Sequence, residues 1–287
     1  MDAPLAGPWV DRLERTIQSE IVPRLLHSRR PTVTASDIAP PRAFSEAEIS
    51  AFVAAILRDD EAVALQLLRS HVADGTPIET IYIDLMAPSA RQLGKMWEND
   101  DCDFIEVTVA MGRLQQMLRE LSRVFLSDLS RPDAVGSIVL SCLPGEQHTL
   151  GVIMVGEFLL RDGWRVQLGA PWGEHDLLTM VEHEWFDVVG FSLGCTTQQA
   201  VLTRQIRRLR AVSQNPDLKV LVGGPCIAMD PELAKRVGAD AMAQDAREAP
   251  RLARSLLPTA AARAASDGPL ASQGTMTCDP DDVRAID

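Results

Sequence analysis

The sequence predicts an α/β protein in which an N-terminal four-helix bundle precedes a flavodoxin-like domain with a five-stranded parallel sheet. Apolar residues recur at helical spacing from about Phe44 to Leu129, and short apolar runs alternate with helical segments after Arg131. The expected divisions are an N-terminal helix and linker (1–43), the bundle (44–131), the sheet domain (134–258) and a disordered tail (259–287) rich in Ala, Ser, Gly and Asp.

The first 43 residues are expected to hold one amphipathic helix. From Trp9 onward an apolar residue stands at every fourth position, with an interruption near Pro23. His27 stands at the end of this helix, where the helix dipole favours an imidazole. The stretch 29–41 is rich in Arg, Pro, Ser and Thr and is typical of a linker.

Four helices are predicted in the bundle. Ser45 and Glu48 form a capping-box pattern at the start of the first helix. Pro88 should kink or split the third, because proline removes a helix hydrogen bond. In the fourth, apolar residues alternate four and three positions apart, a repeat that favours bundle packing. The helical spacing covers residues 49–57, 61–73, 78–96 and 107–125.

Five parallel strands are predicted in the second half of the chain. With a flavodoxin-like order of 2-1-3-4-5, the crevice where the winding reverses lies between strands one and three, at their carboxyl ends. The loops after strands one, three and four should therefore converge on one site. The strands are expected at Ser137–Cys142, Arg165–Leu168, Asp187–Phe191, Lys219–Val222 and Asp240–Met242.

The loop after strand one holds the main candidate for a metal ligand. It reads Leu143-Pro-Gly-Glu-Gln-His-Thr-Leu-Gly151 and leads into a helix expected at Thr149–Arg161. His148 can present a neutral ring nitrogen to a metal, and Glu146 can accept a hydrogen bond from the other nitrogen. Gly151 allows backbone or ligand to come close at the start of the helix.

Composition and charge exclude several classes of protein. The formal net charge of -12 disfavours sequence-independent binding to nucleic acid, which depends on clustered Lys and Arg. No apolar run approaches the ~20 residues of a membrane span, and the N-terminus lacks the pattern of a signal peptide, so a cytoplasmic protein is expected. The five cysteines stand singly, which argues against a zinc knuckle or a disulfide framework.

Three segments resemble the signature of cobalamin-binding domains, Asp-x-His-x-x-Gly, Ser-x-Leu and Gly-Gly. The resemblance implies cobalamin as cofactor, with His148 as the lower cobalt ligand and Glu146 in the place of the usual aspartate. It also implies that the nucleotide tail of the cofactor threads between the serine and glycine loops. Gly194 departs from the serine motif, because a larger residue is usual there. The matching segments are Glu146-x-His148-x-x-Gly151, Ser192-Leu193 and Gly223-Gly224.

The bundle resembles the helical cap of methionine synthase, corrinoid methyl carriers and light-sensing cobalamin regulators, on the segments Leu93–Glu98 and Cys102–Glu106. In the photoreceptor regulators a tryptophan is followed nine and ten residues later by Glu-His. Here Trp97 is followed by Glu106 and Val107, so the bundle offers no imidazole to the upper face. His27 or solvent is then expected as upper ligand. Trp97 either contacts the corrin ring or fills the end of the bundle.

Residues 9–257 resemble the AerR/PpaA antirepressors, most clearly at Thr16–Arg24 and Trp97–Glu120. The resemblance implies a cobalamin-binding, light-responsive transcriptional regulator that antagonises a CrtJ/PpsR-type repressor of photosynthesis and tetrapyrrole genes. Such a protein acts through a protein partner, without binding DNA directly. Nothing in the sequence requires catalytic turnover, so an enzyme is not expected.

Other functions remain open. A corrinoid methyl carrier would use the same His148 and pass a methyl group between methyltransferases. A flavodoxin- or receiver-like domain ranks last, because no Asp ends strand three and no hydroxyl-rich phosphate loop follows strand one. His175, His183 and Glu184 lack the spacing of a zinc helix and are expected to be solvated. The arginines at 204, 207, 208 and 210 form a basic helix face, either solvated or a docking patch.

Overall fold

The computed structural model describes residues 43–58, 61–127, 134–143, 149–168, 174–194 and 196–258. All of their helices and strands belong to one compact unit that begins at Ser45. The predicted N-terminal helix, its linker and His27 lie outside the described residues, as does the predicted tail 259–287.

The first part of this unit is helical, as the apolar spacing predicts. Ser45 forms the predicted capping box, because Ser45 N donates to Glu48 Oε2 at 2.8 Å and Glu48 N donates to Ser45 Oγ at 3.3 Å. A second capping box, which the sequence analysis did not identify, joins Asp103 and Glu106. The helices are α3 (Glu46–Leu57), α4 (Glu61–Ala73), α5 (Ile78–Thr80), η2 (Ile81–Met86), α6 (Ala87–Glu98) and α7 (Phe104–Phe125).

The third helical segment is irregular ahead of Pro88 but is not split. The π-helix η2 replaces α-helical geometry over residues 81–86, where the amide of Ala87 donates to the carbonyl of Tyr82, five residues earlier. Pro88 then lies in the first turn of α6, where its missing N–H is tolerated. The expected kink is thus a π-helical turn inside a continuous helix, with Tyr82 fully buried within it.

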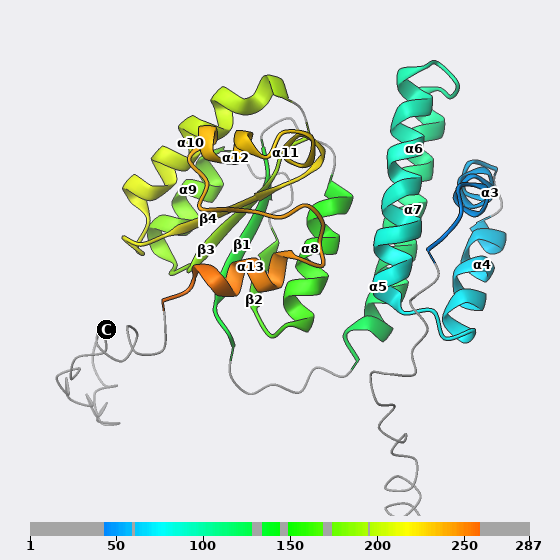
Figure 1. The fold of residues 1–287 in the computed structure, drawn as a ribbon, viewed down its shortest axis with the longest axis horizontal. Helices are drawn as coiled ribbons and strands as arrows, with labels where there is room; N and C mark the ends of the chain where they lie inside the picture. The colour runs from blue at the N-terminus through cyan, green and yellow to red at the C-terminus, as the bar shows by residue number, and fades with distance from the viewer. Residues whose placement is uncertain are drawn as a thin grey trace, which may run out of the picture. The chain divides into compact units, whose positions relative to one another are not determined.

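The second part is a parallel sheet with the predicted strand order β2-β1-β3-β4-β5 (Figure 1). Strands β1 (Ser137–Cys142) and β2 (Arg165–Leu168) have the predicted bounds. The structure shifts β3 to Val188–Ser192, since Asp187 is engaged by Ser137, whose amide donates to its carboxylate at 2.7 Å. The last two strands are β4 (Lys219–Gly223) and β5 (Ala241–Met242).

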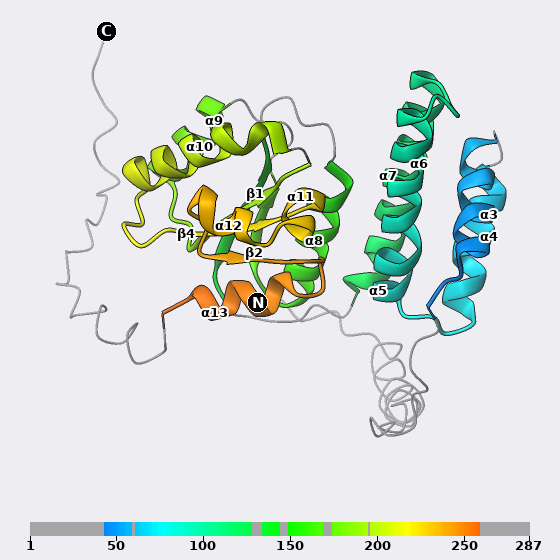
Figure 2. The ribbon, with the colours of Figure 1, turned by 45° about the horizontal axis from the view of Figure 1, so that its top comes forward.

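Helices cover both faces of the sheet (Figures 1 and 2). Apolar residues of α9 (Glu174–His183), α10 (Gln199–Val212) and α12 (Glu232–Val237) pack with Val139, Val189 and Val220 on one face. On the other face, α8 (Thr149–Arg161) and α13 (Ala249–Leu256) pack with Ile138 and Val188. Successive strand residues thus enter opposite cores. The short helices η3 (Thr196–Gln198) and α11 (Pro225–Met229) follow β3 and β4.

Where the structure describes the chain, no helix combines the length and the apolar character that crossing a membrane requires.

Candidate functional site

Three loops start at the same level at the carboxyl edge of the sheet. The register pairs Cys142, the last residue of β1, with Ser192 of β3, and pairs Ser192 with Gly223 of β4. The segments that follow these strands therefore leave the sheet side by side, as the strand order predicts. They include every site residue predicted in the sheet domain.

The loop after β1 carries the predicted cobalt ligand. Glu146 and His148 belong to residues 144–148, outside the described residues, so their roles remain predictions. The segment is bounded by Leu143, buried directly after β1, and by Thr149, the first residue of α8. Gly151 lies in the first turn of α8, and a Cβ placed there would meet no atom of the described residues within 4 Å. The described residues thus leave the space beside Gly151 open.

The loops after β3 and β4 are fastened to each other by backbone hydrogen bonds. Leu193 N donates to Gly223 O at 2.9 Å, and Cys226 N donates to Leu193 O at 3.3 Å. Gly224 has φ +101°, and a Cβ there would lie 2.7 Å from Leu193 O and 2.8 Å from Leu193 N. Only glycine permits this approach. Gly223 and Gly224 therefore allow the loops after β3 and β4 to pack directly against each other.

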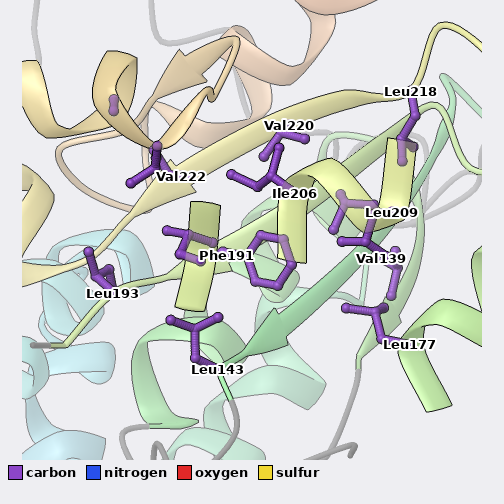
Figure 3. Close-up of a cluster of buried hydrophobic side chains, with 14 of the residues drawn as sticks. Val139, Leu143, Leu177, Phe191, Leu193, Ile206, Leu209, Leu218, Val220 and Val222 are labelled. Carbon is purple, nitrogen blue, oxygen red and sulfur yellow. The ribbon is translucent and has the colours of Figure 1, made fainter. Parts of the chain in front are cut away.

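Ser192 and Leu193 occupy different environments, although both were predicted to bind the cofactor. Ser192 is half-buried at the end of β3. Leu193 is fully buried in the same core cluster as Phe191 and Val222 (Figure 3). The side chain of Leu193 therefore anchors the loop, while Ser192 keeps a hydroxyl near the edge where the three loops begin.

Exposed apolar side chains lie on the helices α6 and α7. Trp97 is 50% exposed, so it is not part of the buried core of the helical part. Phe104 is 63% exposed, Ile105 is 70% exposed, and Val109 is also exposed. None of the three was predicted as a site residue. Ile105 and Val109 fall outside the 3.5-residue repeat, which was the available signal for them, whereas Phe104 lies in phase with the repeat, three residues before Val107.

The direction of α7 places Phe104 beyond the first turn of α8. Gln115 of α7 bonds to Thr149 of α8, and Ser122, two turns later, bonds to Glu157, so both helices run in the same direction. Phe104 precedes Gln115 by three helical turns on the same side, about 16 Å along the axis. Its exposed ring therefore projects past Thr149, on the side of α8 where the loop after β1 enters.

Two other sequence patterns were considered, a histidine-rich segment and the basic face of α10. No group of three or more His, Cys, Asp or Glu residues suited to a metal ion occurs in the described part of the chain. His183 Nδ1 lies 2.8 Å from Thr179 O within its own helix. On the basic face of α10, Arg210 pairs with Asp240 at 2.6 Å.

Comparison with known proteins identifies the sheet domain. Residues 136–253 match the family model of the B12 binding domain. They are a B12-binding domain. The fold is similar to the monomethylamine corrinoid protein of Methanosarcina barkeri, with a TM-score of 0.60 and 19% identity, over 74% of this chain and 100% of that one. The cofactor of the domain is accordingly cobalamin.

A relative in Rhodobacter capsulatus is described as an uncharacterized 20.5 kDa protein in the bchF-crtJ intergenic region. It is 28% identical over 152 residues, which are 53% of this chain and 79% of the relative. This similarity and the B12-binding domain agree with the resemblance to AerR/PpaA-type cobalamin-binding proteins.

The described residues of the B12-binding domain suit a large amphipathic ligand. The open side of Gly151 admits a group that a Cβ would exclude, and the half-buried Ser192 offers a hydroxyl at the same edge of the sheet. Phe104 adds an exposed aromatic ring beyond the start of α8. A corrin combines apolar ring faces with polar side groups, which these two kinds of surface can accommodate.

Proposed function

We propose that this protein is a cobalamin-binding, light-responsive antirepressor that binds a transcriptional repressor of the CrtJ/PpsR type. The observation that carries the proposal is a B12-binding domain in one compact unit with helices whose exposed apolar residues, Trp97 and Phe104, are available to a ligand. The similarity to a protein encoded next to crtJ supports the choice of partner.

In this proposal each predicted site residue has a distinct task. His148 would hold the cobalt, and Glu146 would fix the His148 ring by accepting a hydrogen bond. Ser192 would donate to the nucleotide tail, while Gly223 and Gly224 keep the serine loop in place. Trp97 and Phe104 would contact the corrin.

When bound, cobalamin would supply a light-sensitive cobalt centre. Trp97 and Phe104 would make different contacts with the cofactor in darkness and after illumination, and the helical part would respond through them. A shift between two arrangements can change the affinity for a partner only by the difference in their binding free energies. The output is therefore a change in protein binding, and no catalytic turnover is needed.

The charge of the chain favours a protein partner over DNA. A net charge of -12 repels the phosphate backbone, so the protein acts in the cytoplasm on the repressor and not on the operator. Arg204, Arg207 and Arg208 on the basic face of α10 are exposed. This face offers one place where an acidic segment of the repressor could dock.

A binding experiment tests the proposal. The purified chain, loaded with cobalamin in darkness, is titrated with a CrtJ/PpsR-type repressor before and after illumination. We expect different dissociation constants in the two states, and equal affinities would reject light regulation. His148→Ala, which removes the predicted cobalt ligand, should abolish both the visible spectrum of bound cobalamin and the effect of light.

A corrinoid methyl carrier remains the second candidate, because the sequence analysis predicts the same ligand for it. The likeness to the Methanosarcina barkeri corrinoid protein, at 19% identity, concerns the fold alone. Methyl transfer between partner methyltransferases in a reconstituted system would favour the carrier over the regulator.

A further inference from the structure

A carboxylate is buried where α8 of the B12-binding domain meets α7 of the helical part. Glu157 is only 7% exposed, and its Oε1 accepts a hydrogen bond from Ser122 Oγ at 2.9 Å. Its Oε2 is buried and has no hydrogen-bond partner among the described residues. An unsatisfied buried polar atom destabilises the contact that buries it, and more strongly when it is charged. Glu157 therefore destabilises the contact between α7 and α8 when its carboxylate is charged.

An aromatic cluster lies at the same contact between α8, α7 and η2. Tyr82 of η2, Phe125 of α7 and Phe158 of α8 form a cluster with ring centroids 5.3 Å, 5.4 Å and 6.4 Å apart. Tilted and edge-on ring pairs of this kind stabilise a contact. The cluster therefore holds α8 against η2 and α7, while its low polarity favours the neutral form of the neighbouring carboxyl group.

The electrostatic setting also favours a neutral Glu157. Burial raises the pKa of Glu157, and the hydrogen bond from Ser122 lowers it by less. Tyr82 is kept neutral, chiefly because burial raises its pKa. Arg161 of α8 lies over the Phe125 ring, 4.4 Å from its centroid, and pairs with Glu79. Arg247 pairs with Asp84 of η2, and Arg254 of α13 pairs with Asp162.

We propose that Glu157 is a proton-dependent latch between α8 and the helical part. The neutral carboxyl group holds the contact closed, and its ionisation in water favours the open arrangement. Closing takes up a proton, so the contact is most stable below the ordinary carboxyl pKa of about 4.3. The contact weakens as the pH rises from this ordinary pKa to the raised pKa of Glu157. At higher pH its stability no longer depends on this group.

Glu157 lies on the same pair of helices, α7 and α8, as the residue that follows the predicted cobalt ligand. Gln115 of α7 donates to Thr149 Oγ1 at 3.0 Å, and Thr149 directly follows His148 in the chain. Opening at Glu157 therefore loosens the contact that steadies the first residue of α8. A pH effect on cobalamin ligation rests on the proposed function, whereas the latch itself does not.

Hydrogen–deuterium exchange of the full chain without cobalamin tests the latch. Exchange times are corrected for the intrinsic pH dependence of amides between pH 4 and 8, with α10 as internal reference. In the unmodified protein, protection of 115–125 and 150–161 should fall by at most about tenfold per pH unit, since one proton is involved. Glu157→Gln should remove this dependence.

Ser122→Ala is the matched variant, because it keeps Glu157 but deletes the bond that lowers its pKa. In this variant the protection against exchange should still depend on pH. The pH above which protection stops falling should be higher than in the unmodified protein. The proposal is overturned if Glu157→Gln and the unmodified protein show the same pH dependence, or if Ser122→Ala leaves the range unchanged. Both results are independent of cobalamin, so they leave the proposed light response to its own experiment.

Discussion

Replacing Gly224 by alanine should separate the two loops that meet at the carboxyl edge of the sheet. Gly224 has φ +101° and ψ 171°, a backbone region that is nearly exclusive to glycine and costs other residues about 1–3 kcal/mol. The new Cβ would also lie 2.7 Å from Leu193 O and 2.8 Å from Leu193 N, and relieving such an overlap costs about 1–3 kcal/mol more. We expect the free energy of unfolding to fall by roughly 2–6 kcal/mol.

Thermal unfolding and a hydroxocobalamin titration measure this effect. The loss of stability should lower Tm by roughly 4–24 °C and also weaken cobalamin binding, because Leu193 and Gly223 can no longer keep their 2.9 Å hydrogen bond. Gly151→Ala is the control with the same chemical change. Its Cβ meets no atom, so it should raise stability by up to about 1 kcal/mol while reducing binding. A Gly224→Ala protein as stable as the unmodified chain would refute the steric argument.

Three further predictions concern single side chains. His148→Ala should leave the chain unable to form a cobalamin complex with imidazole-ligated cobalt, seen as a changed or absent visible spectrum; an unchanged spectrum would exclude this ligand. Trp97→Ala and Phe104→Ala should change the free energy of unfolding by no more than about 0.5 kcal/mol, because both side chains are exposed, yet weaken cobalamin binding in a titration. Tyr82→Phe should destabilise the protein by about 1 kcal/mol in denaturant unfolding, because the buried bond from Tyr82 Oη to Leu118 O, 3.3 Å long, is lost.

The sequence predicted much of the arrangement around the site, but not which surfaces stay exposed. The alternation of apolar runs and helices predicts a parallel sheet, and the flavodoxin-like order assumed for it is the observed one, which aligns Ser192 with Gly223. Ser192 and Leu193 belong to the same signature motif, but only the side chain of Leu193 is fully buried in the core. A signature gives the position of a residue in a loop, but the direction of its side chain depends on the packing beneath.

The sequence by itself determined the local elements, because spacing along the chain reports backbone geometry directly. Thr149–Arg161 and Ser137–Cys142 have the bounds that their apolar pattern predicts. Only the tertiary structure decided that Glu157 is buried and that Phe104 is not, since burial depends on which element packs against a given face. A carboxylate within an amphipathic helix is expected to face water until a second helix covers it. In this chain α7 covers Glu157, and the same helix leaves Phe104 exposed beyond the start of α8.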